Sequence, residues 1–205
     1  MSKQLNSLII ILKKEQDFNK FSDEELVKTI VSTNDTLLFE ILYDRFAKMI
    51  YNKCRGFSKS NDEAEDLTQD IFLKLFVKLK TFKGKSKFST WLYAFTYNHC
   101  VNYVNRNTAK KIEKQSVDAT NIEDSGYSIE ENDNDINQLK VEKLKEALEL
   151  ISPEEKMILM LKYQDYLSIK ELADVLDIGE SAVKMRIKRA KEKLINVYND
   201  NENER

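Results

Sequence analysis

The sequence is poor in the residues that interrupt helices. Its 205 residues include one proline and four glycines, whereas 33% of them are charged. Strand-rich folds need more turn residues and more β-branched runs than this, so the composition predicts an all-α protein. A chain of this length can form one large domain or two small ones.

Patterns for metal binding, disulfide bonding and membrane insertion are also missing. Cys54 and Cys100 form no CxxC pair, and the one histidine, His99, completes no zinc-ligand cluster. We therefore expect no metal, no cofactor and a reducing, cytoplasmic location. The apolar run at residues 8–12 is too short for a membrane span and lacks a cleavage-site pattern, so we expect no direct membrane insertion.

The net charge of −2 says nothing about partners, whereas the distribution of charge does. Residues 116–135 contain seven Asp or Glu, no Lys or Arg and few apolar side chains. Such a segment cannot bury enough surface to fold alone, so it predicts a flexible acidic linker. Helical periodicity flanks it on both sides, which predicts two small helical domains joined by this linker.

Capping signals and periodicity predict four helices before the linker. Ser22 and Glu25 form a capping box for the first, and the second covers residues 36–56. The third begins with Asn61 as its cap, and the fourth covers residues 89–107. The third buries an apolar stripe of Ala64, Leu67, Ile71 and Leu75. The other side of the same helix carries a stripe of Asp66, Gln69, Asp70 and Leu73.

The loop at residues 82–87 and the helix after it combine cations with aromatic rings. The cations are Lys78, Lys80, Lys83, Lys85 and Lys87, and the aromatic residues are Trp91, Tyr93, Phe95, Tyr97 and Tyr103. We expect Leu92 and Phe95 in the core, while other rings stack on unpaired bases. Asn98 and Asn102, four residues apart on one face, can hydrogen-bond to base edges.

Residues 168–194 have the pattern of a helix-turn-helix. Ser168 and Glu171 form a capping box, and we assign the costly backbone conformation of the turn to Gly179. The first helix turns Ile169, Leu172, Ala173 and Leu176 inward. The second buries a stripe of Val183, Ile187, Ala190, Leu194 and Val197. Upstream, Ser152 and Glu155 start another helix in the same way.

The exposed side of the second helix is cationic. The residues that fall off its apolar stripe are Lys184, Met185, Arg186, Lys188, Arg189, Lys191 and Lys193. A helix that is buried on one side and cationic on the other fits the major groove of DNA. An ordinary helical bundle with a solvated face is the alternative.

The segments DEAEDLTQDIFLKLF (62–76), FSTWLYAFTYNHCVNY (88–103) and the one at residues 150–194 closely resemble a known family. That family comprises the small two-domain sigma factors of bacterial RNA polymerase, which form the extracytoplasmic-function (ECF) group of the sigma-70 family. The resemblance implies a non-catalytic protein that binds core polymerase, recognises two promoter elements and opens the duplex. The implied divisions are a tail or helix (1–21), the region 2 domain (22–107), the linker (108–138), the region 4 domain (139–200) and a tail (201–205).

The resemblance also implies roles for single residues. Those that match clamp-docking positions for the largest polymerase subunit are Asp66, Gln69, Asp70 and Leu73. Those for the minus-ten element are Lys83, Gly84, Lys85, Ser86, Lys87, Phe88, Trp91, Asn98 and Asn102. Those for the minus-thirty-five element are Ser181, Lys184, Met185, Arg186, Lys188 and Arg189, with Ser181 and Arg186 at positions that contact the DNA backbone.

Further implied partners are the flap of the second-largest polymerase subunit and an anti-sigma factor, which in this family is frequently membrane-bound. The sequence departs from the family at Ala94, where arginine is common, and at Tyr166, where glycine is frequent. Met185 and Lys188 identify no particular promoter. We therefore expect an altered loop path at Tyr166, and the sequence does not identify the promoter that the protein recognises.

Two other classes of protein remain open at this point. A conventional helix-turn-helix regulator with a helical sensing or dimerisation domain would bind DNA alone, as a dimer on a palindrome. A helical enzyme would need a catalytic constellation, yet His99 lies in an aromatic helix without a carboxylate partner in the pattern. Co-purification with core polymerase separates the sigma factor from both.

The linker prediction can be tested by limited proteolysis of the free protein. A flexible acidic segment exposes its backbone to proteases, so we expect the first cuts between about residues 114 and 139. Mass spectrometry of the earliest fragments would identify the sites. Resistance in this segment equal to that of the flanking helices would show that it is packed.

Overall fold

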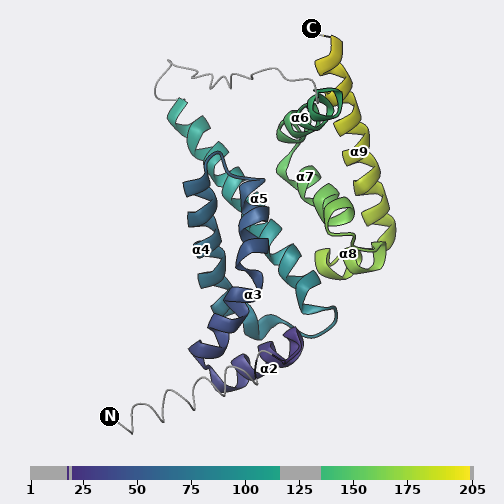
Figure 1. Cartoon of the computed structure of the whole chain (residues 1–205). Helices are drawn as coiled ribbons and strands as arrows, with labels where there is room; N and C mark the ends of the chain where they lie inside the picture. The colour runs from purple at the N-terminus through teal and green to yellow at the C-terminus, as the bar shows by residue number, and fades with distance from the viewer. Residues whose placement is uncertain (1–17, 19, 116–134, 204–205) are drawn as a thin grey trace. The chain divides into compact units, whose positions relative to one another are not determined.

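The computed structural model describes residues 18, 20–115 and 135–203, and every regular element that these residues form is a helix (Figure 1). They divide into two compact units: the first takes the residues up to Cys100 together with Asp174–Leu176, and the second takes Val101–Ala173 and the residues from Asp177 onward. The prediction of an all-α chain with two helical domains is confirmed. Nearly all of the acidic segment and the apolar run at residues 8–12 lie outside the described residues.

The described elements before residue 116 are four α-helices and one short 3₁₀ turn. They are α2 (Asp23–Thr33), α3 (Thr36–Arg55), α4 (Asn61–Lys78), the 3₁₀ turn (Leu79–Thr81) and α5 (Phe88–Gln115). The predicted fourth helix ended at residue 107, but α5 continues beyond it. No glycine or proline occurs between residues 88 and 115, so the sequence holds no signal that would end the helix earlier.

Side-chain caps determine where these helices begin. The predicted capping box at Ser22 is present, with both the Ser22 and the Glu25 side chains bonded to backbone N–H groups. Helix α4 is capped by Ser60 and not by Asn61, because the Ser60 hydroxyl accepts the Glu63 N–H at 3.1 Å. Asn61 is instead the first helical residue. A cap of this kind contributes about 1 kcal/mol.

The core of the first unit contains one buried cation. The apolar stripe predicted on α4 is buried, as are Leu92 and Tyr97, both at 0% exposure. The Lys53 side chain extends into this core, with Nζ 3.4 Å from the Tyr97 hydroxyl and 4.2 Å from the ring centroid of Tyr93. Aromatic faces attract an ammonium group, which offsets part of its loss of hydration.

Cys54 and Cys100 are far apart in the sequence but adjacent in the core. Both are free and buried, and their thiols are hydrogen-bonded to each other. This hydrogen bond, together with burial, raises the pKa of Cys100. The Cys100 thiol therefore stays protonated and acts as a structural group between α3 and α5.

The described elements after residue 134 are four α-helices and a π-helical turn. They are α6 (Asp135–Leu150), α7 (Pro153–Leu159), the π-helical turn (Met160–Gln164), α8 (Ile169–Leu176) and α9 (Glu180–Asn203). Capping boxes at Ser152 and Ser168 are present as predicted. Helix α9 packs against α6 and α7. Of the predicted inner face of α8, Leu172 is buried, and the other three residues are half-buried.

The turn between α8 and α9 differs from the prediction. Asp177 adopts the left-handed conformation, with φ 53°, and caps the end of α8. Gly179 has no positive φ, and a Cβ added there would meet no atom within 4 Å. Asp is among the few residue types that enter this region readily, so glycine was not required in the turn. Within the described ranges, no helix has the length and apolar character that a membrane crossing demands.

The corrected turn predicts that Gly179→Ser is tolerated. Gly179 accepts the Val183 N–H, which places it at the N-cap of α9, where serine is favoured. We expect the free energy of unfolding to rise by about 0.5 kcal/mol. Gly84, with φ 66°, is the matched control, and Gly84→Ser should cost about 1 kcal/mol. Urea denaturation measures both, and equal losses would place a left-handed residue at position 179.

Candidate functional site

Helix α4 presents an acidic and apolar stripe to solvent. Asp66, Gln69 and Asp70 are exposed, and Leu73 is 71% exposed, opposite the buried apolar stripe. Asp70 forms an ion pair of 2.7 Å with Lys74, but a pair between exposed groups contributes little. Val77, at 61% exposure and one turn beyond Leu73, extends the stripe. Sequence reasoning missed Val77, although its four-residue spacing from Leu73 was visible.

The loop between the 3₁₀ turn and α5 exposes its cations and buries its last residue. Lys83, Lys85 and Lys87 are exposed, and Gly84 has the positive φ that this turn requires. Ser86 is half-buried. Phe88 is fully buried, with its ring 5.6 Å from that of Phe46 and 5.3 Å from that of Phe82. Packing leaves the Phe88 side chain no exposed surface, so a minus-ten contact at this position would have to come from its backbone, and the assignment of Phe88 stays a prediction.

The aromatic residues of α5 form a half-buried ladder. The rings of Trp91 and Phe95 are stacked, with centroids 5.2 Å apart, and Phe95 meets His99 edge-on at 4.5 Å. Phe95 was expected in the core but is half-buried, while Tyr97 takes the fully buried position. The spacing of four residues along the helix brings the three rings together. Trp91 is held in place by its neighbours and keeps part of its surface exposed.

Asn98 and Asn102 lie one helical turn apart on α5, and both side chains are exposed. Their amides are thus available to a ligand from the same side of the helix. Ala94, where the family commonly has arginine, is 3% exposed. In this chain position 94 belongs to the core, so a long charged side chain would have to displace its neighbours.

Helix α9 has the predicted division into a buried side and a cationic side. Val183, Ile187 and Ala190 are buried, while Leu194 and Val197 are half-buried. All six residues predicted to contact the minus-thirty-five element are exposed: Ser181, Lys184, Met185, Arg186, Lys188 and Arg189. Lys193 differs from the other cations, because its Nζ lies 3.1 Å from Glu155 of the α7 capping box. Its charge serves the packing of α9 on α7.

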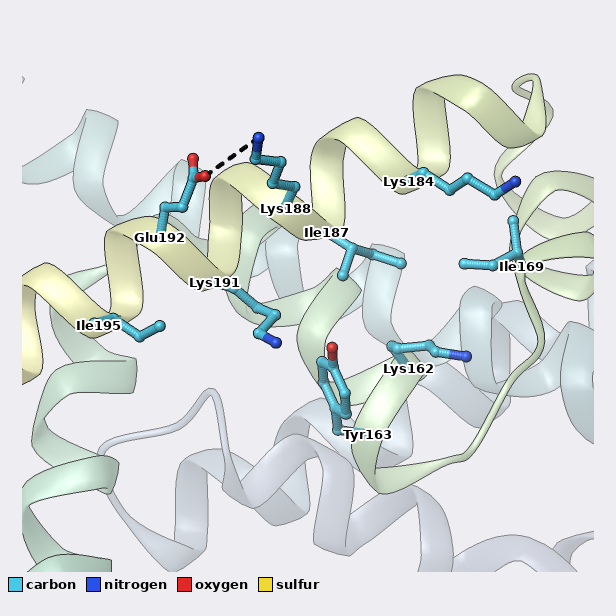
Figure 2. A pocket seen from close by; sticks show the side chains of 9 residues that line it. All are labelled: Lys162, Tyr163, Ile169, Lys184, Ile187, Lys188, Lys191, Glu192 and Ile195. Carbon is cyan, nitrogen blue, oxygen red and sulfur yellow. Dashed lines mark ion pairs between the residues drawn. The ribbon is translucent and has the colours of Figure 1, made fainter.

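A groove runs along α9 beside these residues (Figure 2). Its volume is about 480 Å³, and it is lined by Lys162, Tyr163, Ile169, Lys184, Ile187, Lys188, Lys191, Glu192 and Ile195. Lys188 forms an ion pair with Glu192 at 3.7 Å, and the Nζ of Lys191 lies 5.8 Å from the Tyr163 ring centroid. Lys162 comes from the π-helical turn, so only the fold brings it beside Lys184.

The lining explains which ligands suit the groove. Four ammonium groups and one carboxylate surround a floor of isoleucine side chains. Such a surface attracts polyanions, and the lysine stems still bury apolar area. Sequence reasoning missed Lys162 and Tyr163 because they precede the helix-turn-helix and have no periodic relation to α9.

Comparison with known proteins identifies both units. Residues 42–110 match the family Sigma-70 region 2, and residues 141–194 match the family Sigma-70, region 4. Together the two matches cover more than half of the chain. They occur in the same order as the two helical units.

Full-length relatives and solved structures agree with these matches. The chain is 29% identical over 183 residues to the ECF RNA polymerase sigma-E factor of Escherichia coli (strain K12), covering 86% of this chain and 94% of the relative. The Haemophilus influenzae sigma-E factor is 27% identical over 185 residues, with 86% and 95% covered.

Two solved structures share the fold. The sigma factor RpoE in complex with the anti-sigma factor NepR from Bartonella quintana has a TM-score of 0.54 and 21% identity, covering 78% of this chain and 95% of that one. CnrH in complex with the cytosolic domain of CnrY has a TM-score of 0.56 and 20% identity, with 85% and 96% covered. The chain belongs to the sigma-70 family of RNA polymerase sigma factors and is of the ECF type.

Proposed function

We propose that this protein directs transcription initiation by binding core RNA polymerase, recognising a promoter and melting its DNA, with no catalytic activity of its own. One observation carries the proposal. The chain joins a region 2 unit that exposes an acidic and apolar stripe to a region 4 unit that exposes a cationic helix face. A regulator with a separate sensing domain is not favoured, because the match covers 94% of a sigma factor of similar length.

The stripe on α4 is proposed to dock on the clamp of the largest polymerase subunit. Asp66, Gln69 and Asp70 supply acceptors and an amide, and Leu73 supplies exposed apolar area. Exposed apolar side chains rimmed by polar groups are typical of protein-binding surfaces. This assignment rests on the exposure of the residues and on the family's clamp-docking positions.

The loop at residues 83–87 and the exposed side of α5 are proposed to bind the minus-ten element. The exposed loop lysines fit phosphates, and Trp91 offers a partly exposed ring on which an unpaired base can stack. Asn98 and Asn102 fit base edges that are accessible only after unstacking. Affinity for exposed bases shifts the equilibrium towards melted DNA by no more than the difference in affinity for the two states.

Helix α9 is proposed to enter the major groove at the minus-thirty-five element. Lys184, Met185, Lys188 and Arg189 face the bases, whereas Ser181 and Arg186 contact the backbone. The exposed positions of all six residues support this assignment. The flap of the second-largest polymerase subunit is the proposed protein partner of the same unit.

Domain divisions, location and regulation complete the proposal. We place the region 2 domain at residues 22–107, the linker at 108–138 and the region 4 domain at 139–200, in the cytoplasm. Of the two solved structures with this fold, CnrH is bound to the cytosolic domain of CnrY, and RpoE is bound to an anti-sigma factor. We propose a partner of that class here, and the family supplies the further expectation that it is membrane-bound.

The α4 assignment is tested with the triple variant Asp66→Ala, Gln69→Ala, Asp70→Ala. Truncating interface residues that anchor a partner lowers affinity strongly. We therefore expect the affinity for core polymerase to fall at least about tenfold. The melting temperature should change little, since the three residues are exposed. A pull-down with core enzyme and a thermal melt of the full chain give the two readouts.

The matched control is Glu40→Ala, Asp44→Ala, Asn52→Ala, which removes the same charge from exposed positions of α3. It should leave polymerase binding unchanged. Unaltered binding by the folded α4 variant would exclude the clamp assignment. Failure of the wild-type chain to bind core polymerase would contradict the proposed function itself.

The α9 assignment predicts different defects for Arg189→Ala and Arg186→Ala. A base contact is worth about 1–3 kcal/mol of discrimination, whereas a phosphate contact carries no sequence information. Losing Arg189 should relax the preference at one position of the minus-thirty-five element. Losing Arg186 should weaken all sequences alike and lower the salt dependence by about one ion.

The measurement is binding of the holoenzyme to single-base promoter variants at several salt concentrations. Each variant serves as the control for the other, because both arginines are exposed on the same helix. If both losses were identical and independent of sequence, Arg189 would be another backbone contact and the base-reading assignment would fall.

A further inference from the structure

Tyr166 combines a left-handed backbone with an exposed aromatic side chain. Its φ is 57°, and it is 85% exposed. The other non-glycine residues at positive φ in the described ranges are Asn34 and Asp177, which are residue types that enter this region readily. For tyrosine the same conformation is costly, and at this exposure packing offsets little of the cost.

The fold explains the backbone conformation but not the tyrosine. Residues 160–164 form the π-helical turn, and the Leu167 N–H returns to the Leu161 carbonyl at 3.1 Å. A helix end closed in this way needs a left-handed residue, and glycine is the usual choice. Tyr166 thus adopts a left-handed conformation that glycine enters freely, and the altered loop path expected from the sequence stays a prediction. Stability alone would favour glycine at position 166, so the contacts of the described residues do not account for the phenol.

The sequence around Tyr166 carries two lysines and two acidic residues, Asp165 and Glu171. Lys162 and Lys170 lie four residues before and after it, and the Nζ of Lys162 donates to the Leu167 carbonyl at 3.0 Å. Ile169, three residues on, lines the groove of Figure 2 together with Lys184. Lys162 also lines that groove, and Leu167, whose carbonyl it binds, follows Tyr166 directly, so the loop that carries Tyr166 adjoins the groove at Lys162. The four lysines that line the groove make a polyanion the partner whose charge complements it.

We propose that Tyr166 contacts the DNA backbone, donating its phenol hydroxyl to a phosphate beside the major groove that α9 enters. Tyrosine is among the side chains that contact phosphates without reading sequence. The proposal rests on the proposed function for the identity of the DNA. A backbone contact is independent of sequence, so it can be measured on any duplex.

The experiment uses random-sequence duplex DNA with the full chain, alone and bound to core polymerase. Tyr166→Phe removes only the hydroxyl and should weaken binding about tenfold in both forms. Tyr166→Gly should weaken binding at least as much, while the melting temperature stays the same or rises because the strained residue is gone. The phenol is neutral, so the slope of log affinity against log salt should not change, whereas Arg186→Ala, which removes a proposed cationic backbone contact, should lower it by about one.

Asn34→Gly is the matched control, since it relieves the same conformation in the other unit, and it should leave DNA affinity unchanged. Wild-type affinity in Tyr166→Phe would overturn the proposal. A lower melting temperature in Tyr166→Gly would also overturn it, by assigning the ring a packing role. Absence of core binding by the wild-type chain would remove the proposed function, while the free chain would still show whether Tyr166 contacts DNA.

Discussion

The burial of one apolar stripe on each helix is the constraint on which the exposed surfaces depend. A helix that buries Val183, Ile187 and Ala190 cannot turn about its axis without moving these side chains out of their close-packed core. Its remaining residues are then presented to solvent in a set order. The same holds for α4, where the buried stripe places Asp66 and Leu73 outward. The exposed stripes of α4 and α9 are therefore each the opposite side of a packed helix face.

This dependence explains why so much could be predicted from the sequence. Helical periodicity states which residues share a face, so the faces of α4 and α9 were predicted correctly without tertiary information. Helix ends were harder, because adjacent residues compete for the same role. Ser60 and Asn61 are both good caps, and Asp177 and Gly179 can both turn the chain. Backbone geometry, which the sequence does not contain, decides between them.

The core could not be predicted in the same detail because its contacts join distant residues. Tyr97 was not expected to be fully buried, and its hydroxyl meets Lys53, which lies 44 residues earlier in the sequence. The pairing of Cys54 with Cys100 is a similar case. Lys162 joins the groove on α9 only through the fold of the second unit. Local sequence patterns predict helix faces and caps, but they do not predict which distant residues pair in the core.

The exposed cations of α9 affect a partner before any contact forms. The chain as a whole is nearly neutral, at −2, yet one face of the region 4 unit concentrates positive charge. At physiological ionic strength such a field reaches about 8 Å into solvent. A polyanion that diffuses within this range exerts a torque on the unit and turns α9 towards itself, so a larger share of collisions begins in the productive orientation. Added salt would therefore slow the search for a binding site through the rate of encounter.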